Sequence, residues 1–201
     1  MSINYTNSLF EHEVKIKIND NCHIEFKGII DKMFLKEEED TIYVALIDYK
    51  TGDINANINN ICYGLNLQLP VYIYLAKKAF SKDVCVTGFY YQTILQNEFK
   101  TKNDLDYYNK KQSYIKLQGY TLDINNCDLK FDKTENDSAI INGLRRNNDG
   151  TFSKNSKVLT LLEMKAIERL VESKIIEAGN NIYNGLFDIN PKMIGKENES
   201  C

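Results

Sequence analysis

Asp48 and Lys50 stand two residues apart at the end of an apolar run, 41–47, that is rich in β-branched and aromatic residues. A run of this composition predicts a β-strand. Because successive side chains of a strand point to opposite faces, an acid and a lysine two residues apart share one face. A predicted turn at 51–53 ends the strand just after them. The sequence therefore places a potential metal ligand beside a cation at the tip of a buried strand.

Three more polar side chains are candidates for the same site. Asp31 closes a second strand-like run, upstream of the first. Gln68 and Tyr72 lie four apart in an apolar stretch, about 64–80, that predicts a largely buried helix, so they share one helix face. Buried amide and hydroxyl groups need hydrogen-bond partners. Gln68 and Tyr72 are therefore interpreted as neighbours of the site; the alternative is a pair of satisfied core residues.

The segments before this strand also have local signals. Alternating runs at 13–18 and 22–30, joined by a connector of Asn and Asp at 19–21, predict a β-hairpin. Gly28 is expected to leave room for another backbone or for the substrate. The charged stretch 36–40 predicts a solvated hairpin loop, with an acidic metal patch as the weaker alternative.

Two elements are predicted further along the chain. Residues 83–94 are strongly β-forming and predict the next strand of the same sheet. Thr160 and Glu163 have the spacing of a capping box. They predict the start of a long amphipathic helix that ends near Gly185.

Together, G-x-I-D at 28–31, I-D-Y-K-T-G at 47–52 and L-Q-L-x-x-Y at 67–72 resemble the PD-(D/E)XK nuclease superfamily of the RecB type. Within it, the resemblance is to the nuclease domains of bacterial helicase–nuclease subunits. It continues in V-T-G-F-Y-Y at 86–91 and in the segment 182–191, and so covers most of the chain. D-x-K alone is a common tripeptide, whereas the ordered set of three motifs with this spacing is specific.

The resemblance implies an α/β (α+β) fold, with a restriction-endonuclease-like core in which helices flank a mixed central sheet. It also implies a Mg²⁺-dependent (or Mn²⁺-dependent) deoxyribonuclease that hydrolyses phosphodiester bonds. Asp31, Asp48 and the backbone carbonyl of Tyr49 would hold the metal. Hard oxygen ligands of this kind suit Mg²⁺, which accepts one or two carboxylates together with water and substrate phosphate.

The same resemblance assigns roles to three further side chains. Lys50 would position the attacking water or stabilise the transition state, while Gln68 and Tyr72 would orient Lys50 or contact the DNA backbone. The chain would then be an exonuclease domain acting in double-strand-break repair and recombination, with single-stranded DNA ends and a helicase–nuclease partner subunit as its partners. Two alternatives stay open: a stand-alone RecB-like or CRISPR-associated exonuclease, and a catalytically silent DNA-binding or docking module.

Length and charge set limits on these interpretations. Residues 1–201 are predicted to form a single domain with a loop-rich excursion at about 96–156 that contains short strands. The tyrosines of this excursion and its Arg145–Arg146 pair could stack on bases or hold phosphates, or the excursion could be a solvated insertion. A net charge of −3 excludes a uniformly basic nucleic-acid-binding protein but leaves room for a local basic cleft.

The cysteines and the hydropathy pattern bear on localisation and cofactors. No apolar run is long enough to span a bilayer, and five widely spread cysteines predict a reduced cytoplasmic protein without a membrane partner. The resemblance implies that Cys201 is the first of a cysteine triad that helps to bind a 4Fe–4S cluster in full-length proteins. Such a cluster needs four thiolates. We therefore expect the chain to be truncated at Cys201 and to lack the cluster; the alternative is an ordinary exposed cysteine.

Overall fold

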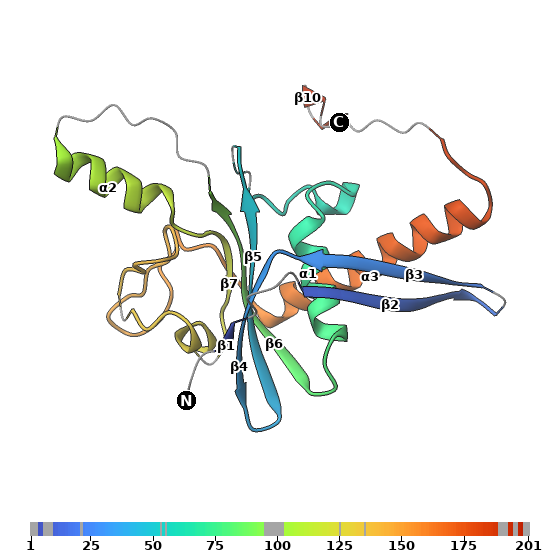
Figure 1. Ribbon diagram of the computed structural model, residues 1–201, viewed down its shortest axis with the longest axis horizontal. Coiled ribbons are helices and arrows are strands. Elements are labelled where there is room, and N and C mark those ends of the chain that lie inside the picture. The colour runs from blue at the N-terminus through green and yellow to red at the C-terminus, as the bar shows by residue number, and fades with distance from the viewer. Residues whose placement is uncertain are drawn as a thin grey trace.

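The structure is a computed structural model that describes residues 4–5, 10–20, 22–52, 54, 56–94, 103–124, 126–134, 136–188, 193–194 and 197–198. A six-stranded mixed sheet lies at its centre (Figure 1). In sheet order, its strands are β1 (Asn4–Tyr5), β4 (Lys32–Glu38), β5 (Thr41–Lys50), β6 (Asp83–Thr93), β7 (Gln118–Leu122) and β8 (Val158–Leu159). The strands predicted at 41–47 and 83–94 are thus neighbours in one sheet.

The middle of the sheet brings the ends of two strands to one edge. β4 runs antiparallel to β5, whereas β5 and β6 are parallel and are connected through α1 (Gln68–Lys78). Because β5 and β6 point the same way, their carboxyl ends meet at the same edge of the sheet (Figure 1). Asp48 and Lys50 lie at this edge.

Two helices cover one face of the sheet. α1 and α3 (Leu161–Tyr183) pack on it, and their apolar side chains join those of β5 and β6 in the main hydrophobic core. Leu46, Ile73, Phe89 and Met164 are almost completely buried there. Burial of each such side chain contributes about 1.5–3 kcal/mol. This packing fixes α1 against β5, which sets the position of the first turn of α1 at the strand ends.

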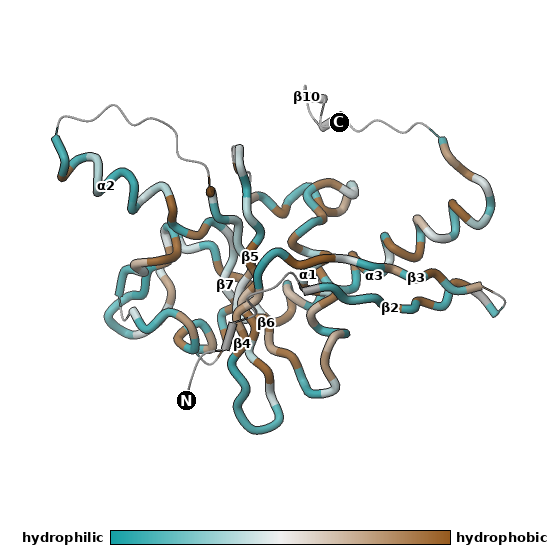
Figure 2. Tube along the Cα trace, in the orientation of Figure 1, coloured by the Kyte–Doolittle hydropathy of each residue, from teal (hydrophilic) through white to brown (hydrophobic). Residues whose placement is uncertain are grey.

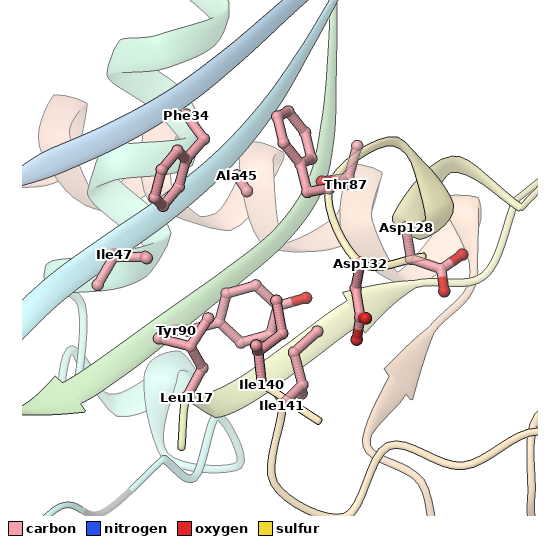
Figure 3. A pocket seen from close by; sticks show the side chains of 11 residues that line it. Phe34, Ala45, Ile47, Thr87, Tyr90, Leu117, Asp128, Asp132, Ile140 and Ile141 are labelled. Atoms are coloured by element: carbon pink, nitrogen blue, oxygen red, sulfur yellow. The ribbon is translucent and has the colours of Figure 1, made fainter. Parts of the chain in front are cut away.

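An irregular segment between β7 and β8 covers the other face of the sheet. It includes the short helix η2 (Cys127–Lys130), and Ile141 and Leu144 from it pack on Tyr90 of β6. A buried ion pair of 2.6 Å between Arg146 and Asp128 holds this segment together. Between the segment and the sheet lies a cavity of about 130 Å³ with a mainly apolar lining (Figure 3).

The predicted hairpin forms, but outside the central sheet. Among the described residues, β2 (Phe10–Asn19) and β3 (Cys22–Ile30) pair only with each other, and they extend away from the sheet (Figure 1). Gly28 does leave room for a neighbour, but the neighbour is the side chain of Leu75 in α1. A Cβ atom on Gly28 would lie 2.3 Å from Leu75 Cδ1, so a side chain there would push α1 away from β3.

The predicted helix at 64–80 is shorter than expected. A 3-10 helix, η1 (Ile61–Tyr63), precedes α1, and Gly64 and Asn66 have φ angles of +84° and +55°. Left-handed residues cannot continue a right-handed helix. The helix therefore begins at Gln68, with Pro70 in its first turn, where a missing N–H group costs little.

The charged stretch 36–40 is mostly strand. β4 continues to Glu38, and only Glu39 and Asp40 form the turn. The charged side chains are tolerated because Glu38 pairs with Lys36 at 2.7 Å and also with Lys130 of η2.

The segment 96–156 contains more regular structure than its sequence suggests. Strand β7 belongs to the central sheet, and α2 (Asp104–Tyr114) was not predicted. α2 lies apart from the sheet (Figure 1) and is mostly hydrophilic (Figure 2). No side chain within α2 is buried. The chain also forms a short antiparallel pair, β9 (Met193–Ile194) with β10 (Glu197–Asn198).

The capping box is confirmed. Thr160 Oγ1 accepts a hydrogen bond from the Glu163 backbone N–H, and the Glu163 carboxylate accepts one from the Thr160 N–H at 2.8 Å. α3 ends at Tyr183, and Gly185 follows it in the left-handed region. None of the helices in the described part of the chain has the length and apolar character needed to cross a membrane.

Candidate active site

Asp48 is the most deeply buried charged residue of the strand edge. Its exposed fraction is 0%, although it lies only two residues from the end of β5. Its Oδ1 atom accepts hydrogen bonds from Gln68 Nε2 at 2.6 Å and from Tyr72 Oη at 3.2 Å. Gln68 Nε2 also lies 3.2 Å from Tyr72 Oη. The first two turns of α1 therefore hold the Asp48 carboxylate in a fixed orientation.

Lys50 lies beside Asp48 on the same face of β5. Its Nζ atom is 2.7 Å from Asp48 Oδ2 and donates a hydrogen bond to Gln68 Oε1 at 2.5 Å. The same Nζ atom lies 5.1 Å from the centre of the Tyr91 ring in β6. The Lys50 side chain is 32% exposed, so its ammonium group is held by three neighbours and still faces solvent.

Asp31 lies directly before β4, the strand next to β5. It is the one residue between β3 and β4, at the point where the chain leaves the hairpin and enters the central sheet. In the antiparallel β4–β5 pair, Lys32 stands opposite Ile47, so Asp31 is one step further along, level with Asp48. Its Oδ2 atom accepts a hydrogen bond of 3.0 Å from the Tyr49 backbone N–H. Residues at such paired positions share one face of a sheet, which brings the two carboxylates together.

The electrostatics of the site centre on the Asp48 carboxylate. Burial raises its pKa, and the Lys50 ammonium and the Tyr72 hydroxyl only partly oppose this effect, while the nearby Asp31 charge adds to it. Burial likewise raises the pKa of Tyr72, which stays a protonated donor. Asp48 Oδ2 is buried and accepts no hydrogen bond with good geometry from the described residues; its close neighbour is the Lys50 charge.

These features fit a divalent cation of the Mg²⁺ type. Two carboxylates and a backbone carbonyl are hard oxygen donors, and the buried Oδ2 atom of Asp48 is paired only with the Lys50 ammonium among the described residues. A third carboxylate, histidine or cysteine does not join them among the described residues. Two carboxylates are enough for Mg²⁺, which keeps several waters in its shell.

All the predicted site residues with described side chains lie at this edge of the sheet. They are Asp31, Asp48, Tyr49, Lys50, Gln68 and Tyr72. Their catalytic roles stay predictions. Cys201 lies outside the described residues, so its predicted part in an iron–sulfur site also stays a prediction.

Sequence reasoning missed Tyr91 as part of the site. Burial, and next the charge of Asp48, raise the pKa of its phenol to about 12. Its position in V-T-G-F-Y-Y contributes to the family resemblance but indicates no role. The strand period could have placed Tyr91 on one of two faces, but it could not show that this face is the one that Lys50 occupies.

A mixed sheet flanked by helices, with two carboxylates and a lysine at the ends of adjacent strands, is the arrangement that the predicted class of nucleases requires. Residues 3–194 match the family model described as PD-(D/E)XK nuclease superfamily. The chain therefore belongs to this superfamily, and its fold is the predicted restriction-endonuclease-like fold. Enzymes of this superfamily typically use divalent metal ions.

The chain is also similar to bacterial proteins that are named as one subunit of an ATP-dependent helicase/deoxyribonuclease. The protein from Caldanaerobacter subterraneus subsp. tengcongensis is 28% identical over 190 residues, which cover 92% of this chain and 16% of that protein. The one from Natranaerobius thermophilus is 28% identical over 86% of this chain and 15% of its own length. The one from Listeria innocua is 26% identical over 94% and 17%. The chain thus spans about a sixth of the curated relatives it matches, and the predicted narrower resemblance is confirmed.

Proposed function

We propose that this chain is a metal-dependent deoxyribonuclease domain that degrades single-stranded DNA from an end. The observation that carries this proposal is the contact of the buried Asp48 carboxylate with Lys50 at 2.7 Å, at a strand edge that Asp31 also reaches. Burying a carboxylate is unfavourable for folding unless it is paired or binds a metal. A buried carboxylate in such an arrangement is therefore expected to have a functional role, such as metal binding.

The residues of the chain divide the chemistry between them. Asp31, Asp48 and the Tyr49 carbonyl would hold the metal, which would supply an activated water and stabilise charge on the scissile phosphate. Lys50, held by Gln68 and by the Tyr91 ring, presents a cation where negative charge develops. Gln68 fixes the relative positions of the Lys50 and Asp48 side chains by forming hydrogen bonds with both. Tyr72 donates to Asp48 and keeps the carboxylate from rotating.

The names of the relatives support a proposal on the wider role of this domain. Their name joins a helicase to a deoxyribonuclease. We infer that this domain works in the cytoplasm next to an ATP-driven helicase that delivers single strands to it, in double-strand-break repair and recombination. We also infer that, in the full-length protein, Cys201 is one of the ligands of a 4Fe–4S cluster.

The experiment uses the purified chain and end-labelled single-stranded oligonucleotides. With Mg²⁺ or Mn²⁺ the parent should degrade them progressively from one end, and EDTA should stop the reaction. Asp48→Ala should abolish cleavage, because one carboxylate is too few to hold the metal. Asp137→Ala is the control, since this exposed acid pairs with Arg145 away from the site.

Two results would contradict the proposal. Cleavage by Asp48→Ala at the parent rate would show that the activity comes from another protein or another site. DNA binding by the parent without cleavage in either metal would favour a catalytically silent module.

A further inference from the structure

A groove of about 430 Å³ lies on the opposite face of the sheet from the Asp48 carboxylate. It is lined by residues of β4, β5 and β6, of α2 and of the segment that follows α2. Three lining residues adjoin the site in sequence: Lys32 follows Asp31, Ile47 precedes Asp48, and Gln92 follows Tyr91. The groove and the site therefore share the same strand ends on opposite faces of the sheet.

The charged side chains that line the groove are all lysines. Lys32 lies with its Nζ atom 5.0 Å from the centre of the Phe34 ring, and Lys116 donates to the Ser138 carbonyl at 3.0 Å. Within the described residues, neither lysine forms an ion pair with an acid, in contrast to surface lysines such as Lys15 and Lys82. Two positive charges without acidic partners suit an anionic ligand.

The floor of the groove is apolar. Phe34, Ile47, Leu117 and Ile140 line both the groove and the cavity beneath the irregular segment, and Figure 3 shows Leu117 and Ile140 close to Tyr90 in that cavity. A ligand that fits must therefore combine negative charge with flat or apolar groups. Single-stranded nucleic acid does so, because its phosphates are charged and its unpaired bases stack on aromatic and apolar side chains.

α2 extends the wall of the groove outward. Leu105, Tyr108, Gln112 and Ile115 follow one another at helical spacing, and the last two line the groove. Gln112 Nε2 donates to Tyr108 Oη at 2.8 Å, which holds the ring along the helix. Leu105 and Tyr108 are 69% and 57% exposed. We call these four residues the α2 stripe. A helix of 11 residues with no buried side chain is only marginally stable on its own, so a ligand bound along the α2 stripe would stabilise it.

We propose that the groove and the α2 stripe hold single-stranded DNA, whose end then passes over the shared strand edge to Asp48. This inference rests on the proposed nuclease function. Lys32 and Lys116 would contact phosphates, and Tyr108 would stack on a base. Duplex DNA does not fit this chemistry as well, because its bases are already stacked and paired.

Binding can be measured separately from cleavage. A fluorescein-labelled oligothymidylate in EDTA reports affinity by fluorescence anisotropy. Lys32→Ala/Lys116→Ala should weaken binding about tenfold, and the slope of log affinity against log salt should fall by about 0.7 for each lost phosphate contact. The control, Lys78→Ala/Lys165→Ala, removes two positive charges from the hollow between α1 and α3 and should bind like the parent.

Tyr108 gives an independent test that leaves the charge unchanged. Tyr108→Ala should weaken binding about tenfold because stacking is lost, whereas Tyr108→Phe should bind almost like the parent. Ultraviolet cross-linking to an oligonucleotide that contains 5-iododeoxyuridine should mark peptides of α2 or β4. Circular dichroism on heating identifies any variant that fails to fold. Parent affinity in folded Lys32→Ala/Lys116→Ala and Tyr108→Ala proteins would overturn the proposal and leave the groove as a surface for a protein partner.

A small chromogenic ester separates this inference from the nuclease proposal. Thymidine 5′-p-nitrophenyl phosphate reaches the metal site without occupying the groove, so the groove variants should hydrolyse it at the parent rate while degrading long DNA more slowly. If the parent hydrolyses neither substrate while the groove substitutions still weaken oligothymidylate binding, the nuclease proposal fails and the inference that the groove binds single-stranded DNA is supported. If the groove variants lose the ester reaction as well, the groove residues belong to the catalytic site and the inference is wrong.

Discussion

Gln68 bonds to both members of the Asp48–Lys50 pair, with Nε2 donating to Asp48 Oδ1 at 2.6 Å and Oε1 accepting from Lys50 Nζ at 2.5 Å. An amide is suited to this position because it offers a donor group and an acceptor group in one fixed plane. The carboxylate and the ammonium are thereby held in fixed relative positions, as the proposed catalysis requires. Gln68 can occupy this position because left-handed residues delay the start of α1 to this point in the sequence.

We predict that Gln68→Ala lowers kcat by about 10–100-fold, since it removes hydrogen bonds to two charged groups. Gln68→Glu should be at least as damaging, because its second oxygen would face Asp48 and replace a donor by a negative charge. Single-turnover cleavage of labelled DNA at saturating metal measures both effects. A fully active Gln68→Ala protein would show that the amide has no positioning role.

Loss of Lys50 should weaken the fold as well as the activity. Asp48 is buried, so Lys50→Met leaves an uncompensated carboxylate. In EDTA at neutral pH, we expect this change to lower the free energy of unfolding by about 1–3 kcal/mol, less than for a fully buried pair because Lys50 is partly exposed. The double variant Asp48→Asn/Lys50→Met should regain most of the loss, since it has no buried charge. Urea denaturation measures all three proteins.

The pH dependence of this defect follows from the Asp48 pKa. Burial raises that pKa, so the folded protein binds a proton on Asp48 more tightly than the unfolded chain does. Protonation of Asp48 therefore favours the folded state, and the gain is lost as pH rises through the raised pKa. The defect of Lys50→Met should be full at neutral pH and should shrink on acidification. A defect that grows as pH falls would contradict this account.

More of the candidate site than of the central sheet could be predicted from the sequence. The period of a strand places Asp48 and Lys50 on one face, and the period of a helix does the same for Gln68 and Tyr72. Such local spacing contains no information on which strands pair. The level position of Asp31 beside Asp48 depends on the β4–β5 register, and the family resemblance, not the spacing, brought Asp31 to the site.

The elements that sequence reasoning missed lack apolar patterns. α2 buries no side chain, so its polar sequence has no helical stripe facing a core, and its N-cap at Asn103 is the main local signal. The end of β4 has the composition of a charged loop because its acids and lysines form ion pairs rather than a buried face. The start of α1 is hard to place because Asn66 adopts a left-handed conformation that its type permits but does not require.

The capping box of α3 gives a prediction on stability alone. Thr160→Ala removes the acceptor for the Glu163 N–H and should lower the free energy of unfolding by about 1 kcal/mol. Hydrogen bonds from Thr160 lower the pKa of Glu163 below its ordinary 4.5. The stabilisation by Glu163 is therefore present above pH 4.5 and is lost as pH falls through the lowered pKa. Glu163→Gln should differ from the parent at pH 7 and approach it at acidic pH, as followed by thermal unfolding.

The ring of Tyr91 should position Lys50 by its aromatic face. Lys50 Nζ lies 5.1 Å from the ring centre, and no hydrogen bond from the Tyr91 hydroxyl to a described residue is found. A cation over an aromatic ring gains about 0.5–2 kcal/mol, depending on its exposure. Tyr91→Phe keeps the ring and should retain kcat within about twofold, whereas Tyr91→Leu keeps an apolar side chain without the ring and should lower kcat about 3–30-fold.

The comparison between these two variants distinguishes positioning from packing. Tyr91 is 7% exposed, so Tyr91→Leu also costs stability, and the loss of kcat must be measured under conditions where the variant is fully folded. If the ring acts through Lys50, substitution of Tyr91 by Leu in a Lys50→Met background should cause no further loss of the residual activity, because the cation is already absent. An equal loss in both backgrounds would show that Tyr91 serves only to fill the core. Retained activity in Tyr91→Leu would show that Gln68 and Asp48 are sufficient to place the lysine.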